Sequence, residues 1–218
     1  MTHLQDHLDE ITSNTRQLVQ PERLAVSERT VEELFATGIE EHILPVGEIA
    51  PEFTLNDSTG RQVSSQDLLG LGPLVINFFR GRWCPYCVTE LETWRDLYRS
   101  VRERGALLVG ISPQNEKQSD FTIQQHLLPY PLLSDPGCRV AEKFKIAYTV
   151  PEMYQEYYRS ILVNIPFING DESWRLPLPA TYVLASDRRI VYAEAFADFR
   201  VRPEPDEVLN ALSGLRFG

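Results

Sequence analysis

The sequence predicts an α/β fold in which a central mixed sheet is flanked by helices and preceded by an N-terminal helical extension. The apolar run at 74–79, LVINFF, is typical of a strand that is buried on both faces. A second such run follows at 106–111. Between the two runs, apolar side chains recur at helical steps of three and four residues, at Leu91, Trp94, Tyr98 and Val101. A strand, a helix and a strand in this order favour parallel pairing through a right-handed crossover.

Composition and charge limit the classes of function. The chain has 218 residues, of which 43% are hydrophobic and 24% charged, so we expect a globular protein with a sizeable core. The formal net charge of -10 argues against binding to nucleic acid or to an anionic membrane surface through a general electrostatic attraction. The partners that we expect are therefore small molecules or other proteins.

The N-terminus and the cysteine count bear on the compartment. The first residues, MTHLQDHLDE, contain no basic region followed by an apolar one, so nothing indicates secretion and we expect a cytoplasmic protein. Three cysteines are too few for a disulfide framework. A close pair of them beside a strand-helix-strand unit is more typical of catalysis, redox chemistry or metal binding.

Residues 1–44 are predicted to form the helical extension. One helix is indicated by leucines at near-heptad spacing, Leu4, Leu8 and Leu18, together with Ile11. The chain breaks at Gln20-Pro21, and we expect a second helix to start near 27–30. Two short amphipathic helices are not stable alone in water. They are expected to pack on the chain's own core or, as an alternative, to form an arm that makes a homodimer.

Residues 45–218 are predicted to form the main domain. Its expected elements beyond the first strand-helix-strand unit are a hairpin at 53–63, a short helix up to Leu69, helices near 113–128 and 138–144, antiparallel strands at 181–196 and a last helix from Pro205. The stretch 146–178 is too long for a loop in a compact domain, so it is interpreted as an insertion with its own structure. Its many aromatic residues are expected to cover the core or an interface, and no cofactor is predicted.

The candidate chemistry lies at WCPYC, Trp83 to Cys87. Two cysteines follow a buried strand and come at the start of a helix that we expect to begin at Cys87. Free N–H groups and the positive end of a helix dipole favour a thiolate there. Arg80 and Arg82 add positive charge. This stretch is therefore predicted to perform thiol chemistry.

WCPYC resembles the redox-active CxxC of thioredoxins and glutaredoxins, while a wider frame resembles the peroxiredoxin and alkyl hydroperoxide reductase superfamily. Three segments carry that second resemblance, VGEIAPEFTLND, VINFFRGRWCPYCVTE and LLSDPGCRVAEKF, and it covers roughly 46–213. It implies a thioredoxin-like fold of peroxiredoxin type. It also implies an antioxidant oxidoreductase that is reduced by thioredoxin or another thiol.

Matching CVTE with the CPTE of peroxiredoxins places Cys87 on the position of the thiolate that attacks a hydroperoxide. Cys84 then stands where that family keeps a Thr or Ser hydroxyl. The family's Pro in the same loop and its Arg before a late strand are also replaced, the latter by 178–181. Pro179 instead resembles the cis-proline that faces the CxxC in thioredoxin-like proteins.

Two catalytic hypotheses follow. In the first, Cys87 reduces a hydroperoxide and Cys84 resolves its sulfenic acid as a disulfide, with Arg82 favouring the thiolate and Trp83 shielding the site. In the second, the protein is a disulfide oxidoreductase in which Cys84 attacks a partner disulfide and Cys87 releases it.

A third hypothesis is not enzymatic, with the pair acting as a redox sensor or a zinc site. Zinc needs about four ligands, and the other candidates are scattered, at Cys138, His42 and His126. No metal site is therefore predicted. Cys138 is interpreted as a small buried residue rather than a second resolving thiol. The charged run from Asp198 through Arg200 to Arg202 is predicted to be a solvated edge.

Overall fold

A computed structural model describes residues 3–215. Its main sheet has seven strands, which in spatial order are β2 (Gln62–Ser64), β1 (Thr54–Asp57), β5 (Leu132–Ser134), β4 (Leu107–Ser112), β3 (Leu74–Phe78), β8 (Ala180–Leu184) and β9 (Ile190–Ala195). β4 pairs in parallel with both β3 and β5, and the other neighbours are antiparallel. The mixed central sheet and the predicted fold class are confirmed.

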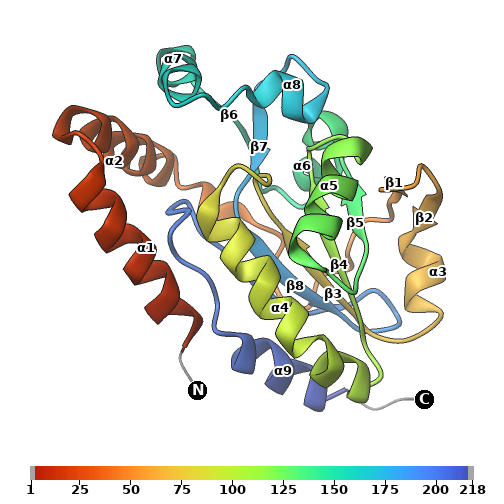
Figure 1. Cartoon of the computed structure of the whole chain (residues 1–218). Coiled ribbons are helices and arrows are strands. Elements are labelled where there is room, and N and C mark those ends of the chain that lie inside the picture. The colour runs from red at the N-terminus through yellow and green to blue at the C-terminus, as the bar shows by residue number, and fades with distance from the viewer. Residues whose placement is uncertain (1–2, 216–218) are drawn as a thin grey trace.

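Helices cover both faces of this sheet, because strands such as β3 carry apolar side chains on both sides. In β3, Val75 and, just beyond the end of the strand, Phe79 pack on one face, while Leu74, Ile76 and Phe78 pack on the other. The first face carries α4 (Pro85–Glu103), α5 (Glu116–His126) and α9 (Pro205–Ser213). α4 and α5 lie in front of the strands in Figure 1, and α9 lies at the bottom of the view. The second face carries α3 (Ser65–Leu69), the 3-10 turn η2 (Pro136–Cys138) and α6 (Arg139–Lys143). A strand covered on both sides needs the continuous apolar run that the sequence contains.

The N-terminal extension forms α1 (Leu4–Leu18), α2 (Pro21–Ala36) and the 3-10 turn η1 (Ile39–His42). α1 packs along α4, with Leu4 and Leu8 buried in the core of that face (Figure 1). α2 starts at Pro21, so the prediction of a start near 27–30 is wrong. Proline is favoured in the first turn of a helix because its missing N–H needs no partner there. α2 buries none of its residues and contacts η1 and the insertion.

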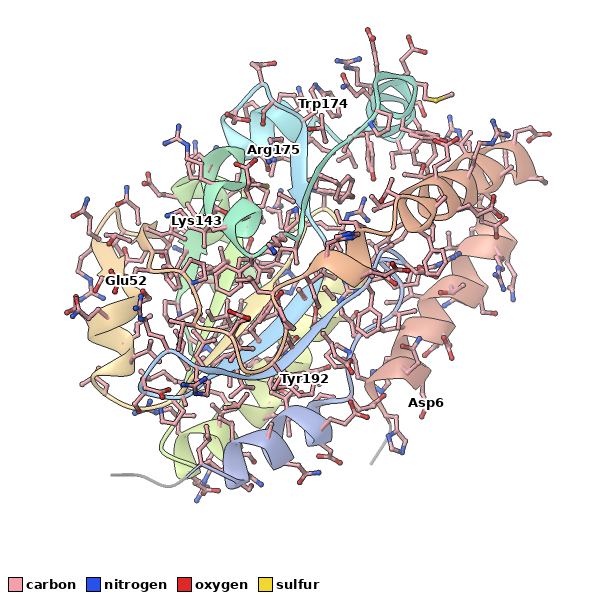
Figure 2. All side chains as sticks on the ribbon, turned by 180° about the vertical axis from the view of Figure 1, so that it is seen from behind. Asp6, Glu52, Lys143, Trp174, Arg175 and Tyr192 are labelled. Atoms are coloured by element: carbon pink, nitrogen blue, oxygen red, sulfur yellow. The ribbon has the colours of Figure 1, made fainter. Side chains whose placement is uncertain are left out.

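The insertion at 146–178 contains β6 (Ala147–Thr149), α7 (Glu152–Ser160), α8 (Ile165–Asn169) and β7 (Arg175–Pro177). β6 and β7 form a separate two-stranded sheet. A third apolar cluster lies beside it and includes Tyr154, Tyr158 and Trp174, with Val26 of α2 packed against it. Figure 2 shows Trp174 and Arg175 at the end of the molecule where α7 lies, far from Tyr192. This cluster joins the insertion to the N-terminal extension.

Within residues 3–215, no helix is both long enough and apolar enough to cross a membrane.

Candidate active site

The two thiols lie where β3 passes into α4. Cys84 is the N-cap of α4 and Pro85 is its first residue, so the helix starts two residues before Cys87, contrary to the prediction. Proline at the first helical position fixes this start. Cys87 falls in the first turn of the helix. Both cysteines are free thiols and both are buried, with exposed fractions of 1% for Cys84 and 0% for Cys87.

The environment favours the thiolate form at Cys84 over that at Cys87. Burial opposes ionisation of Cys84, but a hydrogen bond with Cys87 and the charges of Arg80 and Arg202 outweigh it and lower the pKa of Cys84 to about 6. Burial, the same hydrogen bond and the neighbouring negative charge raise the pKa of Cys87 well above its ordinary value. These shifts favour the thiolate at Cys84 and the neutral thiol at Cys87.

Arg80 is the first of two buried arginines beside the pair. Its guanidinium lies 4.8 Å from the ring centroid of Trp83 and 4.4 Å from that of Phe199, and it donates a hydrogen bond to the hydroxyl of Tyr158. Its Nε has no hydrogen-bond partner among the described residues. Burial disfavours the charged form of Arg80, while Tyr148, Tyr158 and the two thiols raise its pKa. The Cys84 thiolate is thus its counter-ion.

Arg202 is the second buried arginine beside the thiol pair, and its predicted exposure is wrong. It was predicted to lie on a solvated edge, but it is buried and its Nη2 lies 3.3 Å from the Cys87 sulfur. Its Nε donates to Glu90 Oε2 at 2.6 Å, and Asn77 donates to the other oxygen of Glu90 at 2.7 Å. The carbonyls of Phe199 and Val201 also accept from Arg202. These bonds satisfy a guanidinium that would be costly to bury alone.

Arg82 does not support the thiolate, contrary to the prediction. Its backbone N–H donates to Gln114 and its guanidinium donates to Gln118, while its charge lies 4.2 Å from the ring centroid of Phe121. Those partners belong to α5 and the loop before it. The β3–α4 turn therefore directs Arg82 away from the sulfurs and Arg80 toward them.

Trp83 and Pro179 were also predicted site residues. Trp83 is half-buried and packs edge-on against Tyr158, with ring centroids 5.3 Å apart, so it covers Arg80. The peptide bond before Pro179 is trans, as are all others in residues 3–215, so the predicted cis bond is wrong. A trans bond is the more stable form of X-Pro. The extended chain bonds to Ile146 through the N–H of Leu178 and to Phe196 through the carbonyl of Pro179.

A cleft of about 470 Å³ lies above Cys84. Cys84, Arg80 and Trp83 line it from the site, whereas Cys87 does not line it. Its walls come from α1, α2, the start of α4, α7 with the turn after it, and the loop before α9. The lining side chains include Leu18, Leu24, Tyr86, Tyr157, Ile161 and Phe199. Pockets of roughly 300–1,000 Å³ with mostly apolar walls are typical of small-molecule sites. A ligand that enters this cleft meets Cys84 first.

The remaining candidates lie apart from this site. Cys138 is fully buried in the core of the opposite face, and burial raises its pKa well above its ordinary value. Among the residues that the structure describes, no three His, Cys, Asp or Glu side chains are placed to hold a metal ion.

Comparisons with known proteins show the family of this chain. The model of the AhpC/TSA family matches residues 46–193. A chloroplastic peroxiredoxin Q from Gentiana triflora is 31% identical over 100 residues, which are 46% of this chain and 46% of that protein. A putative peroxiredoxin bcp from Helicobacter pylori is 32% identical over 126 residues, 58% of this chain and 82% of that protein. The chain thus spans about half the length of the peroxiredoxin Q relatives that it matches.

Solved structures show the same fold. The crystal structure of peroxidoxin BcpB from Mycobacterium tuberculosis superimposes with a TM-score of 0.63 at 24% identity, over 80% of this chain and 99% of that one. A peroxiredoxin Q variant from Xylella fastidiosa gives 0.61 at 20% identity, over 78% of this chain and 96% of that one. The thioredoxin-like fold of peroxiredoxin type is confirmed.

Proposed function

Because this chain belongs to the AhpC/TSA family, we propose that it is a thiol peroxidase that reduces hydroperoxides through the pair Cys84 and Cys87. The observation that carries the proposal is the position of Cys84. It is the residue of the pair that lines the cleft and it is the N-cap of α4, and a hydrogen bond with Cys87 together with two buried arginines lowers its pKa to about 6. The thiolate is the nucleophilic form of cysteine.

In the first step the Cys84 thiolate attacks the terminal oxygen of the hydroperoxide. The O–O bond breaks, a sulfur–oxygen bond forms, and the alkoxide leaves as an alcohol after taking up a proton. Cys84 becomes a sulfenic acid. Arg80 lines the cleft beside Cys84, so its charge stabilises the negative charge that develops on the departing oxygen.

In the second step Cys87 resolves the sulfenic acid. Its sulfur attacks the sulfur of Cys84, the sulfur–oxygen bond breaks, and water leaves with the proton of Cys87. Two thiols are oxidised to one disulfide while one hydroperoxide is reduced. Arg202 contacts Cys87 at 3.3 Å and favours the thiolate character that this attack needs.

The proposed order of attack is the reverse of the one that alignment of CVTE with peroxiredoxins implies. That alignment gives the first attack to Cys87. Cys87 has no exposed surface and does not line the cleft, and its pKa is raised. Cys84 therefore takes the role of the attacking thiol, as in the CxxC of thioredoxins.

The same position of Cys84 supports a second candidate function, disulfide oxidoreductase activity toward a partner. Burial opposes it for large partners, because only 1% of Cys84 is exposed. A hydroperoxide can reach the floor of the cleft, whereas a disulfide on a folded protein meets its walls first. Hydroperoxide reduction is therefore the better supported of the two.

The test uses the reduced protein and one equivalent of cumene hydroperoxide. Peptide mass mapping is expected to find a Cys84–Cys87 disulfide, with loss of two thiols and with Cys138 still free. Cys138→Ser serves as the matched control and should behave as the unmodified protein does. If peroxide is consumed but Cys84 and Cys87 stay reduced, the proposal is wrong. Rapid reduction of insulin without peroxide turnover would favour the second function instead.

A further inference from the structure

The oxidised pair must be reduced before a second turnover, and the structure limits what can reach it. Cys84 is 1% exposed and Cys87 is not exposed. α2 contributes Leu24, Ser27 and Thr30 to the wall of the cleft above them. Thiol–disulfide exchange depends on access of the attacking thiolate to the sulfur. A folded protein dithiol cannot approach Cys84 while α1, α2 and α7 stand around it.

The walls of the cleft formed by α2 and α1 are each fixed by contacts with neighbouring elements. Val26 of α2 packs against the apolar cluster of the insertion, and α2 contacts α7 directly. On the side of α1, Thr12 and Tyr86 share a hydrogen bond of 3.2 Å. The cleft is therefore a built feature that the reductant has to enter.

The charges of the cleft indicate what enters. The charged residues that line it are one glutamate, Glu28, and four arginines, Arg16, Arg23, Arg80 and Arg200. Arginines therefore outnumber carboxylates in the lining of the cleft, on a chain whose net charge is -10. Arg200 is held by Asp198 in two hydrogen bonds of 2.8 and 2.9 Å, and Arg16 lies 3.9 Å from Glu28. Arginine binds carboxylates through paired N–H donors.

We propose that the reductant of the Cys84–Cys87 disulfide is a small thiol that carries carboxylates and binds inside the cleft, with Arg23 on α2 as one of its contacts. This inference rests on the proposed disulfide. It assigns a class of partner, a low-molecular-weight thiol rather than a protein dithiol.

The exchange takes two molecules of the small thiol. The thiolate of the first attacks the sulfur of Cys84, the Cys84–Cys87 bond breaks, and Cys87 leaves as a thiolate beside Arg202 and takes up a proton. The second attacks the sulfur of the first, which frees Cys84 as a thiolate. Two small thiols are oxidised to one small disulfide, and two cysteines of the protein are reduced.

The test measures the rate at which the oxidised protein is reduced by glutathione, a thiol with two carboxylates. The disulfide is prepared with diamide, so that the measurement does not depend on peroxidase activity. On the unmodified protein, glutathione should react about tenfold faster than its diethyl ester, which has the same thiol but no carboxylate, a difference of ~1.4 kcal/mol. Thioredoxin at equal concentration should be slower than glutathione.

Charge reversal on α2 supplies matched variants. Arg23→Glu should slow glutathione by about tenfold and leave the rate of the ester unchanged. Arg29→Glu changes the same charge on an exposed residue of the same helix that does not line the cleft, so it should leave both rates unchanged. Equal rates for glutathione and its ester would overturn the proposal, as would a faster reaction with thioredoxin. If diamide yields a disulfide but peroxide does not, the peroxidase proposal alone fails.

Discussion

Arg80 is a buried arginine, with an exposed fraction of 2%. Among the groups that raise its pKa are two tyrosines and the two thiols, and none is a carboxylate. A buried charge without a counter-ion is strongly unfavourable. The thiolate of Cys84 and the guanidinium of Arg80 therefore stabilise each other.

Removal of Arg80 should therefore raise the pKa of Cys84. We expect Arg80→Met to move it up from about 6 by about 1–2 units, the usual effect of losing an opposite charge nearby. The measurement is the rate of alkylation of Cys84 by iodoacetamide as a function of pH, followed by peptide mass spectrometry. In the unmodified protein this rate should fall as the pH falls through about 6, because the thiolate becomes protonated.

Arg82→Met is the matched control for this prediction. Its guanidinium contacts Gln118 and Phe121 rather than the sulfurs. The pH profile of Cys84 should keep its midpoint in this variant. A profile that moves equally in both variants, or in neither, would contradict the role of Arg80.

Among individual residues, the reactive cysteine pair and the charge of Arg80 could be predicted from the sequence, but the role of Arg202 could not. WCPYC is a local pattern, and positive charge beside it at Arg80 was expected from its place in the chain. Arg202 is 115 residues from Cys87, so no spacing relates them. Its place in an alternating charged run indicates an exposed edge, and only the fold brings it under α4.

The N-terminal helices differ in how they are held. α1 buries Leu4 and Leu8 in the same core as α4, whereas Leu18 at its other end is 84% exposed. α2 buries no residue. The stability of the extension on the domain is therefore concentrated in the first half of α1.

Leu8→Ala should lower the free energy of unfolding by about 2–5 kcal/mol, because it leaves a cavity in a closed core. Leu18→Ala should change the free energy of unfolding by less than about 0.5 kcal/mol, because the Leu18 side chain is mostly exposed and buries little apolar surface. Urea unfolding followed by circular dichroism measures both. Equal effects of the two substitutions would mean that α1 does not dock through Leu8.

Periodicity located most elements because the pattern within a helix or strand is local. It placed the strand from Leu74 and the helix from Pro205 correctly. The start of α2 was placed too late, although Pro21 is itself a signal for the first turn of a helix. The start of α4 was likewise placed at Cys87 rather than at Pro85.

Four parts of the chain that are distant in sequence meet at the thiol pair. The extension and the insertion supply walls of the cleft, the β3–α4 turn supplies Cys84 and Arg80, and the loop before α9 supplies Arg202. The sequence predicted the sheet because a strand-helix-strand unit and its apolar runs are continuous. The cleft could not be predicted, because it depends on contacts between the extension, the insertion and the loop before α9, and no local sequence pattern relates these segments.

This arrangement leaves Cys84 facing the cleft and Cys87 behind it, so that Cys84 should be the thiol that a hydroperoxide oxidises first. Trapping of sulfenic acid with dimedone tests this directly, in the variants Cys87→Ser and Cys84→Ser, each also carrying Cys138→Ser so that one thiol remains. With one equivalent of hydroperoxide, we predict dimedone on Cys84 in the first variant and none on Cys87 in the second. Dimedone on Cys87 and none on Cys84 would contradict the account.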